Sequence, residues 1–128
     1  MKLLLDTNII IQAAGDLLSI EAEKYVSDEK NELYYSSASI WEIAIKRSLN
    51  RRDFDIDPHI LNKALIENGY NQLPITAEHT LLTGTLPMIH KDPFDRILVA
   101  QSMSEGISLL TTDKRIADYP APVILVGK

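Results

Sequence analysis

The sequence predicts an α/β protein in which helices pack around a parallel β-sheet. Five short apolar runs have the length of buried strands. Segments with helical periodicity lie between these runs, and strands that alternate with helices form βαβ units with parallel strands. The chain has 128 residues, near the usual size of one domain, and it contains no internal repeat, low-complexity segment or interior linker. We therefore expect a single domain over residues 1–128.

The first strand is expected at residues 2–5, where an apolar run is bounded by polar residues. The later apolar runs predict strands at residues 33–35, 72–75, 107–110 and 123–126. Helical patterns predict helices at residues 9–14, 19–29, 39–49, 58–68, 77–82, 93–105 and 114–118. The segment 83–92 contains Gly84 and Pro87, and it predicts a loop that leads into the helix at Pro93.

The composition excludes several kinds of site. The absence of cysteine rules out disulfides, zinc–thiolate sites and cysteine nucleophiles. The three histidines, His59, His79 and His90, lack the HxH or HxxxH spacing of a histidine metal site, and the glycines form no phosphate-binding loop. No segment reaches the roughly 18 apolar residues needed to span a bilayer. Because Asp6 also interrupts the first apolar run, we expect a cytoplasmic protein without a signal peptide.

The net charge of −5 comes from 18 acidic and 13 basic residues. Such a charge argues against a nucleic-acid partner, because phosphate binding usually needs a basic surface. A nuclease that works through metal ions is an exception, since its cleft concentrates carboxylates and the metal supplies the positive charge. Charge alone therefore leaves a nucleic-acid partner open.

Two aspartates follow predicted strands directly. Asp6 comes after the first strand, and Asp113 comes after the strand in "GISLLTT". In open parallel sheets, sites form at the carboxyl ends of the strands, which places both acids at the same edge. Each residue also has a simpler explanation, because aspartate is a common helix N-cap.

The two other candidate acids have structural explanations as well. Ser39 and Glu42 fit the spacing of a capping box, and Glu42 could also form an i,i+4 pair with Lys46. This local pattern favours a structural role for Glu42. In "HKDPFDR", Pro93 suits the first helical position, which makes Asp92 the N-cap and places Asp95 in the first turn. Asp95 remains available for other chemistry.

Together these acids carry a resemblance to a known family. The series of Asp6 in "LLLDTN", Glu42 in "SIWEIAIK", Asp95 in "DPFDR" and Asp113 in "LLTTDKRI" closely resembles the PIN-domain ribonucleases. It is most similar to the VapC-type toxins of bacterial toxin–antitoxin pairs. The first motif is common, whereas the combination of the later three in this order is highly specific.

The resemblance implies a three-layer α/β/α sandwich around a five-stranded parallel sheet. It implies a divalent metal, Mg²⁺ or Mn²⁺, held at the strand ends by the acidic quartet of Asp6, Glu42, Asp95 and Asp113. The supporting polar residues of the family fall on Asn8 and Thr112. It also implies endonucleolytic cleavage of RNA, a homodimer, and inhibition by a small antitoxin protein.

The chemistry of phosphodiester hydrolysis agrees with an all-oxygen site. Hard divalent cations prefer carboxylate oxygens, and they can activate water and stabilise charge on phosphoryl oxygens. Without the four proposed site acids, 14 acidic residues would face 13 basic ones, a net charge of −1. An RNA backbone could then meet cations near the motifs, namely Lys46, Arg47, Arg51, Arg52, Lys91, Arg96, Lys114 and Arg115.

Three alternatives remain open at this level. A receiver-type signalling module also binds Mg²⁺ on a parallel sheet, but it would carry paired acids after the first strand and an aspartate after the third. A haloacid-dehalogenase-like phosphatase would have D-x-D where this chain has Asp6 and Asn8. A catalytically idle PIN domain could serve as a binding partner only, although the intact acidic quartet argues against it.

Overall fold

The computed structural model describes residues 1–49 and 55–128. Its five strands form one sheet in the order β3-β2-β1-β4-β5, and all neighbouring strands are parallel. The strands are β1 (Lys2–Leu5), β2 (Glu32–Ser36), β3 (Asn71–Leu73), β4 (Ser108–Thr111) and β5 (Val123–Leu125). Each of the five predicted strands is confirmed, with ends that differ by no more than two residues.

Within the described residues, six α-helices connect or follow the strands. They are α1 (Thr7–Ala14), α2 (Ile20–Val26), α3 (Ser37–Ser48), α4 (Pro58–Glu67), α5 (Ala77–Thr83) and α6 (Pro93–Glu105). The helix predicted at 114–118 is wrong, because only a single 3₁₀ turn, η1 (Ile116–Asp118), forms there. Tyr119 has an extended backbone before Pro120, as expected for a residue whose helical conformation would clash with the proline ring.

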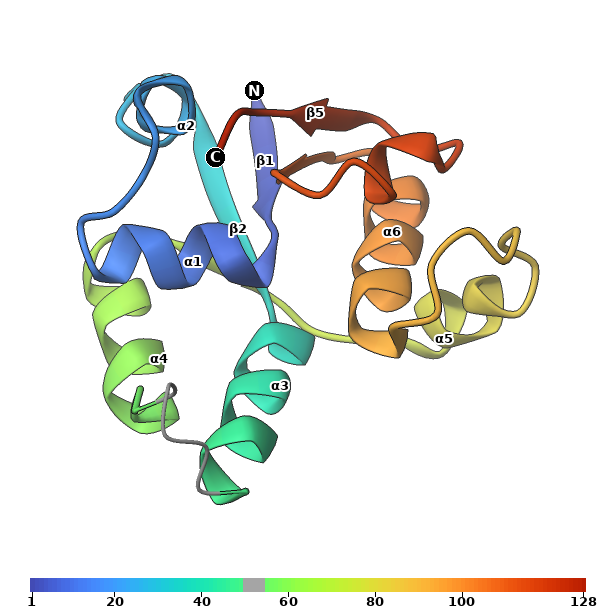
Figure 1. The fold of residues 1–128 in the computed structure, drawn as a ribbon, viewed down its shortest axis with the longest axis horizontal. Coiled ribbons are helices and arrows are strands. Elements are labelled where there is room, and N and C mark those ends of the chain that lie inside the picture. Colours follow the sequence, from blue (N-terminus) through green and yellow to red (C-terminus); the bar gives the residue numbers. More distant parts are fainter. Residues whose placement is uncertain (50–54) are drawn as a thin grey trace.

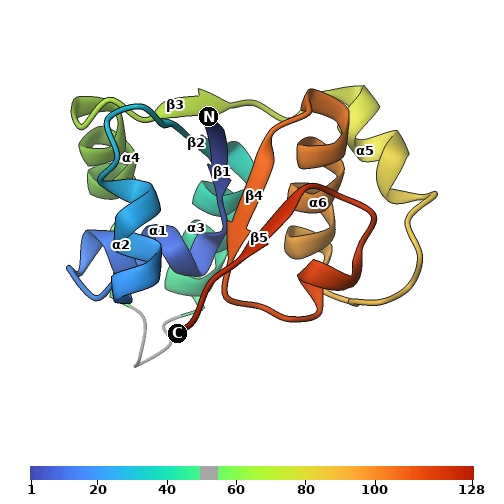
Figure 2. The ribbon, with the colours of Figure 1, turned by 90° about the horizontal axis from the view of Figure 1, so that it is seen from above.

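The sheet lies between two apolar layers. Leu3 and Leu5 of β1 point into a cluster with α1, α2, α3 and α4, whereas Leu4 points into a cluster with α6 and η1. This alternation follows from the two-residue period of a strand that is buried on both faces. Figure 2 shows α1, α2 and α4 on one side of the strands and α5 and α6 on the other. The predicted three-layer α/β/α arrangement is therefore confirmed.

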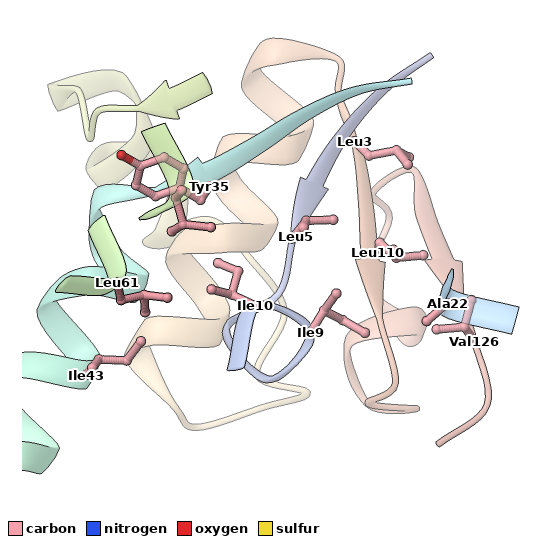
Figure 3. Close-up of a cluster of buried hydrophobic side chains, with 11 residues drawn as sticks. Leu3, Leu5, Ile9, Ile10, Ala22, Tyr35, Ile43, Leu61, Leu110 and Val126 are labelled. Atoms are coloured by element: carbon pink, nitrogen blue, oxygen red, sulfur yellow. The ribbon is translucent and has the colours of Figure 1, made fainter. Parts of the chain in front are cut away.

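The first of these clusters fixes α1 under the sheet. Figure 3 shows Ile9 and Ile10 of α1 close to strand residues Leu5 and Leu110, with Val126 nearby. The side chains of Ile9 and Ile10 are fully buried. Burying a side chain of this size contributes about 1.5–3 kcal/mol, so the start of α1 is held firmly at the end of β1.

The strand order places a reversal between β1 and β4, from which the chain runs outward in both directions. Sites in such sheets form at the carboxyl ends of the strands beside the reversal. The order also excludes a receiver-type module, which has the order 2-1-3-4-5.

Helix α3 packs against both α4 and α6, and Figure 1 shows it below the ends of β1 and β2. Within the described residues, no helix is long and apolar enough to cross a membrane.

Candidate active site

Asp6 follows β1 directly and is only 2% exposed. Oδ2 of this carboxylate accepts a hydrogen bond of 2.6 Å from Oγ1 of Thr111, the last residue of β4. Asp6 occupies the N-cap position of α1, but its side chain makes no capping hydrogen bond. The helix-cap explanation of Asp6 is therefore wrong, and the carboxylate instead faces the edge of the sheet where β1 and β4 end.

Glu42 lies on the second turn of α3, which starts after the N-cap residue Ser36. The predicted capping box of Ser39 and Glu42 is wrong, because Ser39 lies inside the helix and Oγ of Ser39 is 2.8 Å from Oγ1 of Thr7. That buried hydrogen bond joins α3 to the start of α1. It thereby holds together the two helices that flank the carboxylates of Asp6 and Glu42.

The Glu42 side chain is buried, with 7% of the residue exposed. The predicted pair with Lys46 is confirmed, since Oε2 of Glu42 lies 2.9 Å from Nζ of Lys46. Among the described residues, Oε1 of Glu42 is buried and has no hydrogen-bond partner. A buried carboxylate oxygen without a donor is costly, so this atom is well suited to face a cation.

Helix α6 begins as the sequence predicts. Asp92 is the N-cap, its Oδ1 accepts a hydrogen bond of 2.8 Å from the Phe94 N–H, and Pro93 is the first helical residue. Asp95 lies in the first turn. Because a crossover helix runs back along the sheet, its N-terminus lies at the carboxyl ends of the parallel strands. This topology brings Asp95 to the edge where Asp6 lies.

Asp113 combines a local role with a place in the site. Its Oδ1 accepts a hydrogen bond of 2.9 Å from the Arg115 N–H, which closes a tight turn after β4. Its Oδ2 lies 3.1 Å from Nε2 of His90. The Asp113 N–H donates to Oγ1 of Thr111 at 3.0 Å. Asp113 therefore stabilises its own turn with one carboxylate oxygen and faces the site with the other.

His90 is the site residue that sequence reasoning missed. Its buried ring places Nε2 2.9 Å from Oδ2 of Asp95 as well as 3.1 Å from Asp113. His90, Asp95 and Asp113 each offer an atom within 4.8 Å of the others. His90 was missed because the sequence patterns of histidine metal sites require a second histidine nearby, whereas His90 contacts two aspartates. The available signal was its position two residues before the N-cap Asp92 in "HKDPFDR".

The acids are close enough to alter each other's ionisation. Burial, followed by the charges of Asp6, Asp92, Glu42 and Asp113, raises the pKa of Asp95 to about 8. Burial also raises the pKa of Asp6, against the opposing effect of the Thr111 hydrogen bond. Partial burial would raise the pKa of Asp113, but hydrogen bonds from the Arg115 N–H and His90 outweigh it and hold this pKa below its ordinary value. The cluster thus has excess negative charge that a cation would relieve.

A family comparison agrees with this geometry. The model of the PIN domain family matches residues 3–122. The chain belongs to the PIN domain family. A comparison with curated proteins gives no match.

Solved structures of several complexes contain a chain with the same PIN fold. VapBC2 from Rickettsia felis, bound to a DNA fragment from its promoter, matches with a TM-score of 0.73 and 16% identity over 100% of this chain and 99% of that chain. VapBC-1 from nontypeable Haemophilus influenzae matches with a TM-score of 0.66 and 22% identity over 98% of each chain. VapBC-5 from Mycobacterium tuberculosis, a toxin–antitoxin system, matches with a TM-score of 0.65 and 14% identity over 99% of this chain and 98% of that chain.

The two supporting residues expected from the resemblance lie beside the PIN site, formed by Asp6, Glu42, Asp95 and Asp113, and not between its acids. Asn8 and Thr112 line a surface hollow of about 420 Å³ together with Asp113. The hydrogen bond to Asp6 is made by Thr111, the residue before Thr112. Successive side chains of a strand point to opposite faces, so a shift of one residue changes which hydroxyl reaches the carboxylate.

The residues of the PIN site fit a hard divalent cation. Its potential ligands are carboxylate oxygens, which Mg²⁺ and Mn²⁺ prefer, and the unpartnered Oε1 of Glu42 is a buried acceptor that such a cation would satisfy. The raised pKa of Asp95 also agrees with a cation site, because a nearby cation would stabilise the charged carboxylate and lower this pKa. The donor set contains no thiolate that would favour zinc.

Proposed function

We propose that this PIN domain is a metal-dependent endoribonuclease, the VapC-type toxin of a toxin–antitoxin pair. The observation that carries the proposal is the grouping of carboxylates at one edge of the sheet. His90 contacts both Asp95 and Asp113, and Thr111 links Asp6 to the turn of Asp113. The charges of Asp6, Glu42 and Asp113 contribute to the raised pKa of Asp95, which agrees with this grouping. Family membership and the similarity to VapBC structures support it. The proposal includes a cytoplasmic location and a single domain over residues 1–128.

In this proposal the four acids hold Mg²⁺ or Mn²⁺. The cation would supply a Lewis acid for the phosphoryl oxygens and lower the pKa of water at the site. The hydroxyl of Thr111 keeps the Asp6 carboxylate oriented, and Lys46 does the same for Oε2 of Glu42. Such supporting hydrogen bonds to metal ligands fix their geometry and tune their basicity.

The RNA backbone would be bound by exposed cations around the acids. Lys91, Lys114 and Arg115 are exposed next to the motifs that carry the acids. Arg115 also lies near a site acid, with its Nε 3.6 Å from Oδ1 of Asp113. Arg47 pairs with Asp57, away from the site acids, with Nη1 3.0 Å from Oδ2. Arg96 donates hydrogen bonds to backbone carbonyls, and so serves the fold. Two further cations proposed from the sequence, Arg51 and Arg52, lie outside the described residues.

A small antitoxin protein is the proposed regulator. An antitoxin segment that carries Arg or Lys would place its cation among the buried carboxylates and compete with metal there. The similar structure VapBC-5 from Mycobacterium tuberculosis belongs to a family of toxin–antitoxin systems, which supports a partner of this kind. The same acidic cluster would thus serve catalysis and inhibition.

The proposed homodimer would use an apolar surface beside the site. Trp41 and Met88 are 59% and 72% exposed, and with Phe94 they line a hollow of about 570 Å³. The rings of Trp41 and Phe94 pack edge to face with centroids 5.1 Å apart, a favourable arrangement for two aromatic rings. Exposed aromatic residues and methionine are enriched at interfaces, and a two-fold axis brings the same surface of a second copy onto it.

The test is RNA cleavage by the purified chain, freed of antitoxin, with Mg²⁺ or Mn²⁺ and then with excess EDTA. We expect cleavage that depends on metal and that is absent from Asp6→Asn protein purified in the same way, which controls for contaminating nucleases. Cleavage that continues undiminished in EDTA would overturn the metal mechanism. Metal binding without cleavage of any RNA would instead support the catalytically idle alternative.

A further inference from the structure

We propose that His90 is a positioning residue of the acidic site. Its Nε2–H holds the carboxylates of Asp95 and Asp113 in a fixed relation to each other. For its catalytic consequence the inference rests on the proposed nuclease function. Its structural part, the state of the histidine ring, can be tested without any metal or RNA.

The hydrogen bonds of the ring assign its proton. Nδ1 accepts a hydrogen bond of 3.1 Å from the Asp92 N–H, so this nitrogen carries no proton. A neutral imidazole then has its proton on Nε2. Nε2 makes a hydrogen bond of 3.1 Å with Oδ2 of Asp113, and it also lies 2.9 Å from Oδ2 of Asp95. The Nε2–H therefore donates to Asp113 while the same nitrogen lies against the Asp95 carboxylate, so the ring stands between the two acids.

This tautomer makes His90 a donor to the acids rather than a metal ligand. A histidine nitrogen binds metal only when it is unprotonated, and in this ring the unprotonated nitrogen faces the Asp92 N–H. Direct ligation would require the ring to turn and lose that bond. His90 consequently acts on a cation only through Asp95 and Asp113, whose Oδ2 atoms it contacts.

The backbone of His90 is held by a second set of contacts. The His90 N–H donates to the Tyr119 hydroxyl at 2.8 Å, and the same hydroxyl donates to the His90 carbonyl at 3.2 Å. The Arg96 guanidinium donates to this hydroxyl at 3.1 Å and to the Thr83 carbonyl at 2.7 Å. Within the described residues Arg96 pairs with no carboxylate, and its Nη1 and Nη2 groups donate to carbonyls of the loop that carries the histidine.

These contacts of Tyr119 and Arg96 explain how a loop can hold the ring of His90 in a defined place. The segment from Gly84 to Asp92 contains no helix or strand, and loops are ordinarily more mobile than the elements they connect. Arg96 and Tyr119 fasten it to α6 and to the turn after η1. When such contacts support a loop, its side chains can stay within about 0.5 Å of the geometry that catalysis needs.

The first test is the NMR spectrum of the metal-free protein in mildly alkaline buffer. Long-range proton–nitrogen correlations of the imidazoles are assigned to His90 by comparison with the His90→Gln variant. We expect a neutral ring protonated on Nε2 alone. A ring protonated on Nδ1 alone would overturn the Nε2–H donor, whatever the protein does to RNA.

The second test measures Mn²⁺ binding by calorimetry, together with kcat and KM for RNA. His90→Leu should weaken Mn²⁺ binding by about 10–100-fold, as expected when an outer hydrogen bond to metal ligands is lost. The kcat should fall while KM for RNA changes little, because the histidine orients acids rather than substrate. His90→Gln keeps an N–H donor of similar reach and should restore most of the loss. His59→Leu, at an exposed histidine of α4, is the matched control and should behave as wild type.

Tyr119→Phe tests the same idea without touching the ring, and should weaken Mn²⁺ binding in the same direction by a smaller factor. Wild-type Mn²⁺ affinity in His90→Leu would overturn the positioning role. So would a His90→Gln variant that melts like wild type but binds Mn²⁺ as poorly as His90→Leu. Wild-type protein that binds Mn²⁺ but cleaves no RNA would overturn the proposed function, while the effect of His90 on Mn²⁺ affinity would still support the positioning role.

Discussion

Oγ1 of Thr111 donates a hydrogen bond of 2.6 Å to Oδ2 of Asp6, and the two residues are 105 positions apart in the sequence. They meet because β1 and β4 are neighbours in the sheet, where Leu5 pairs with Leu110. The same oxygen of Thr111 accepts a hydrogen bond from the Asp113 N–H at 3.0 Å. One hydroxyl therefore links the carboxylate after β1 to the turn that carries the acid after β4.

Replacing this hydroxyl should destabilise the protein. Thr111→Val has nearly the same shape but leaves a buried carboxylate oxygen and a backbone N–H without their partner. We expect the free energy of unfolding of the metal-free protein to fall by about 1–3 kcal/mol, measured by chemical denaturation. Thr111→Ser keeps the hydroxyl and should lose much less.

Thr112→Val is the matched control for this prediction. Among the described residues the Thr112 side chain makes no hydrogen bond, so its replacement should change the free energy of unfolding by no more than about 0.5 kcal/mol. Equal effects of the two valine variants would contradict the role of Thr111.

Asp6→Asn should abolish RNA cleavage while leaving the metal-free protein at least as stable as wild type. The reason is that Asp6 is buried beside other acids and makes no capping bond that asparagine would have to replace. At about 100 times its dissociation constant, Mg²⁺ should stabilise wild type by roughly 2.7 kcal/mol and the variant far less. Thermal melting of both proteins, in EDTA and then in Mg²⁺, measures this difference. A difference between the two proteins that is the same in both buffers would contradict a metal role for Asp6.

The stability of the metal-free protein should depend on pH through Asp95. Its folded-state pKa of about 8 lies above its ordinary value of 3.8, so the folded protein binds this proton more tightly than the unfolded chain. The stabilisation from Asp95 is therefore fully present below its ordinary pKa and is lost as pH rises towards about 8. Asp95→Asn should remove this part of the pH dependence, as measured by denaturation across this range. A constant stability difference between wild type and Asp95→Asn at all pH values would show that the raised pKa is wrong.

Metal binding should follow the opposite trend with pH. Because a cation needs the ionised carboxylate, the apparent affinity for Mg²⁺ should rise as pH approaches about 8. Titration calorimetry at several pH values measures this directly. Proton release on binding should be visible in buffers of different ionisation enthalpy.

The proposed dimer surface gives a further prediction. Trp41→Glu places a charge in the apolar hollow formed with Met88 and Phe94, and it should convert the protein to a monomer. Light scattering coupled to gel filtration measures the mass. Ile20→Glu is the control, because Ile20 is an equally apolar residue, 81% exposed on α2, and should leave the dimer intact. A wild-type protein that is monomeric across micromolar concentrations would exclude the dimer itself.

The strands could be predicted from the sequence because their signal is local. Runs such as Leu3–Leu5 are buried on both faces, and a short continuous apolar run between polar residues indicates such a strand without reference to the rest of the chain. The signal for the start of α6 was also local, because the N-cap Asp92 is followed directly by Pro93 at the first helical position. The region after Asp113 was predicted wrongly because the turn at Asp113 and the proline after Tyr119 leave room for only one 3₁₀ turn.

The sequence by itself determined the α/β class, the five strands and the four acids that carry the family resemblance, because each depends on residues near one another in the chain. Only the tertiary structure decided what those acids contact. Strand pairing selects Thr111 instead of Thr112 as the donor to Asp6, and packing of α3 turns Glu42 from an exposed helix residue into a buried one. His90 reaches Asp95 and Asp113 because the Arg96 and Tyr119 contacts fold its loop over the site. These are long-range contacts, and no local spacing in the sequence encodes a hydrogen bond between segments that meet only when the sheet is assembled.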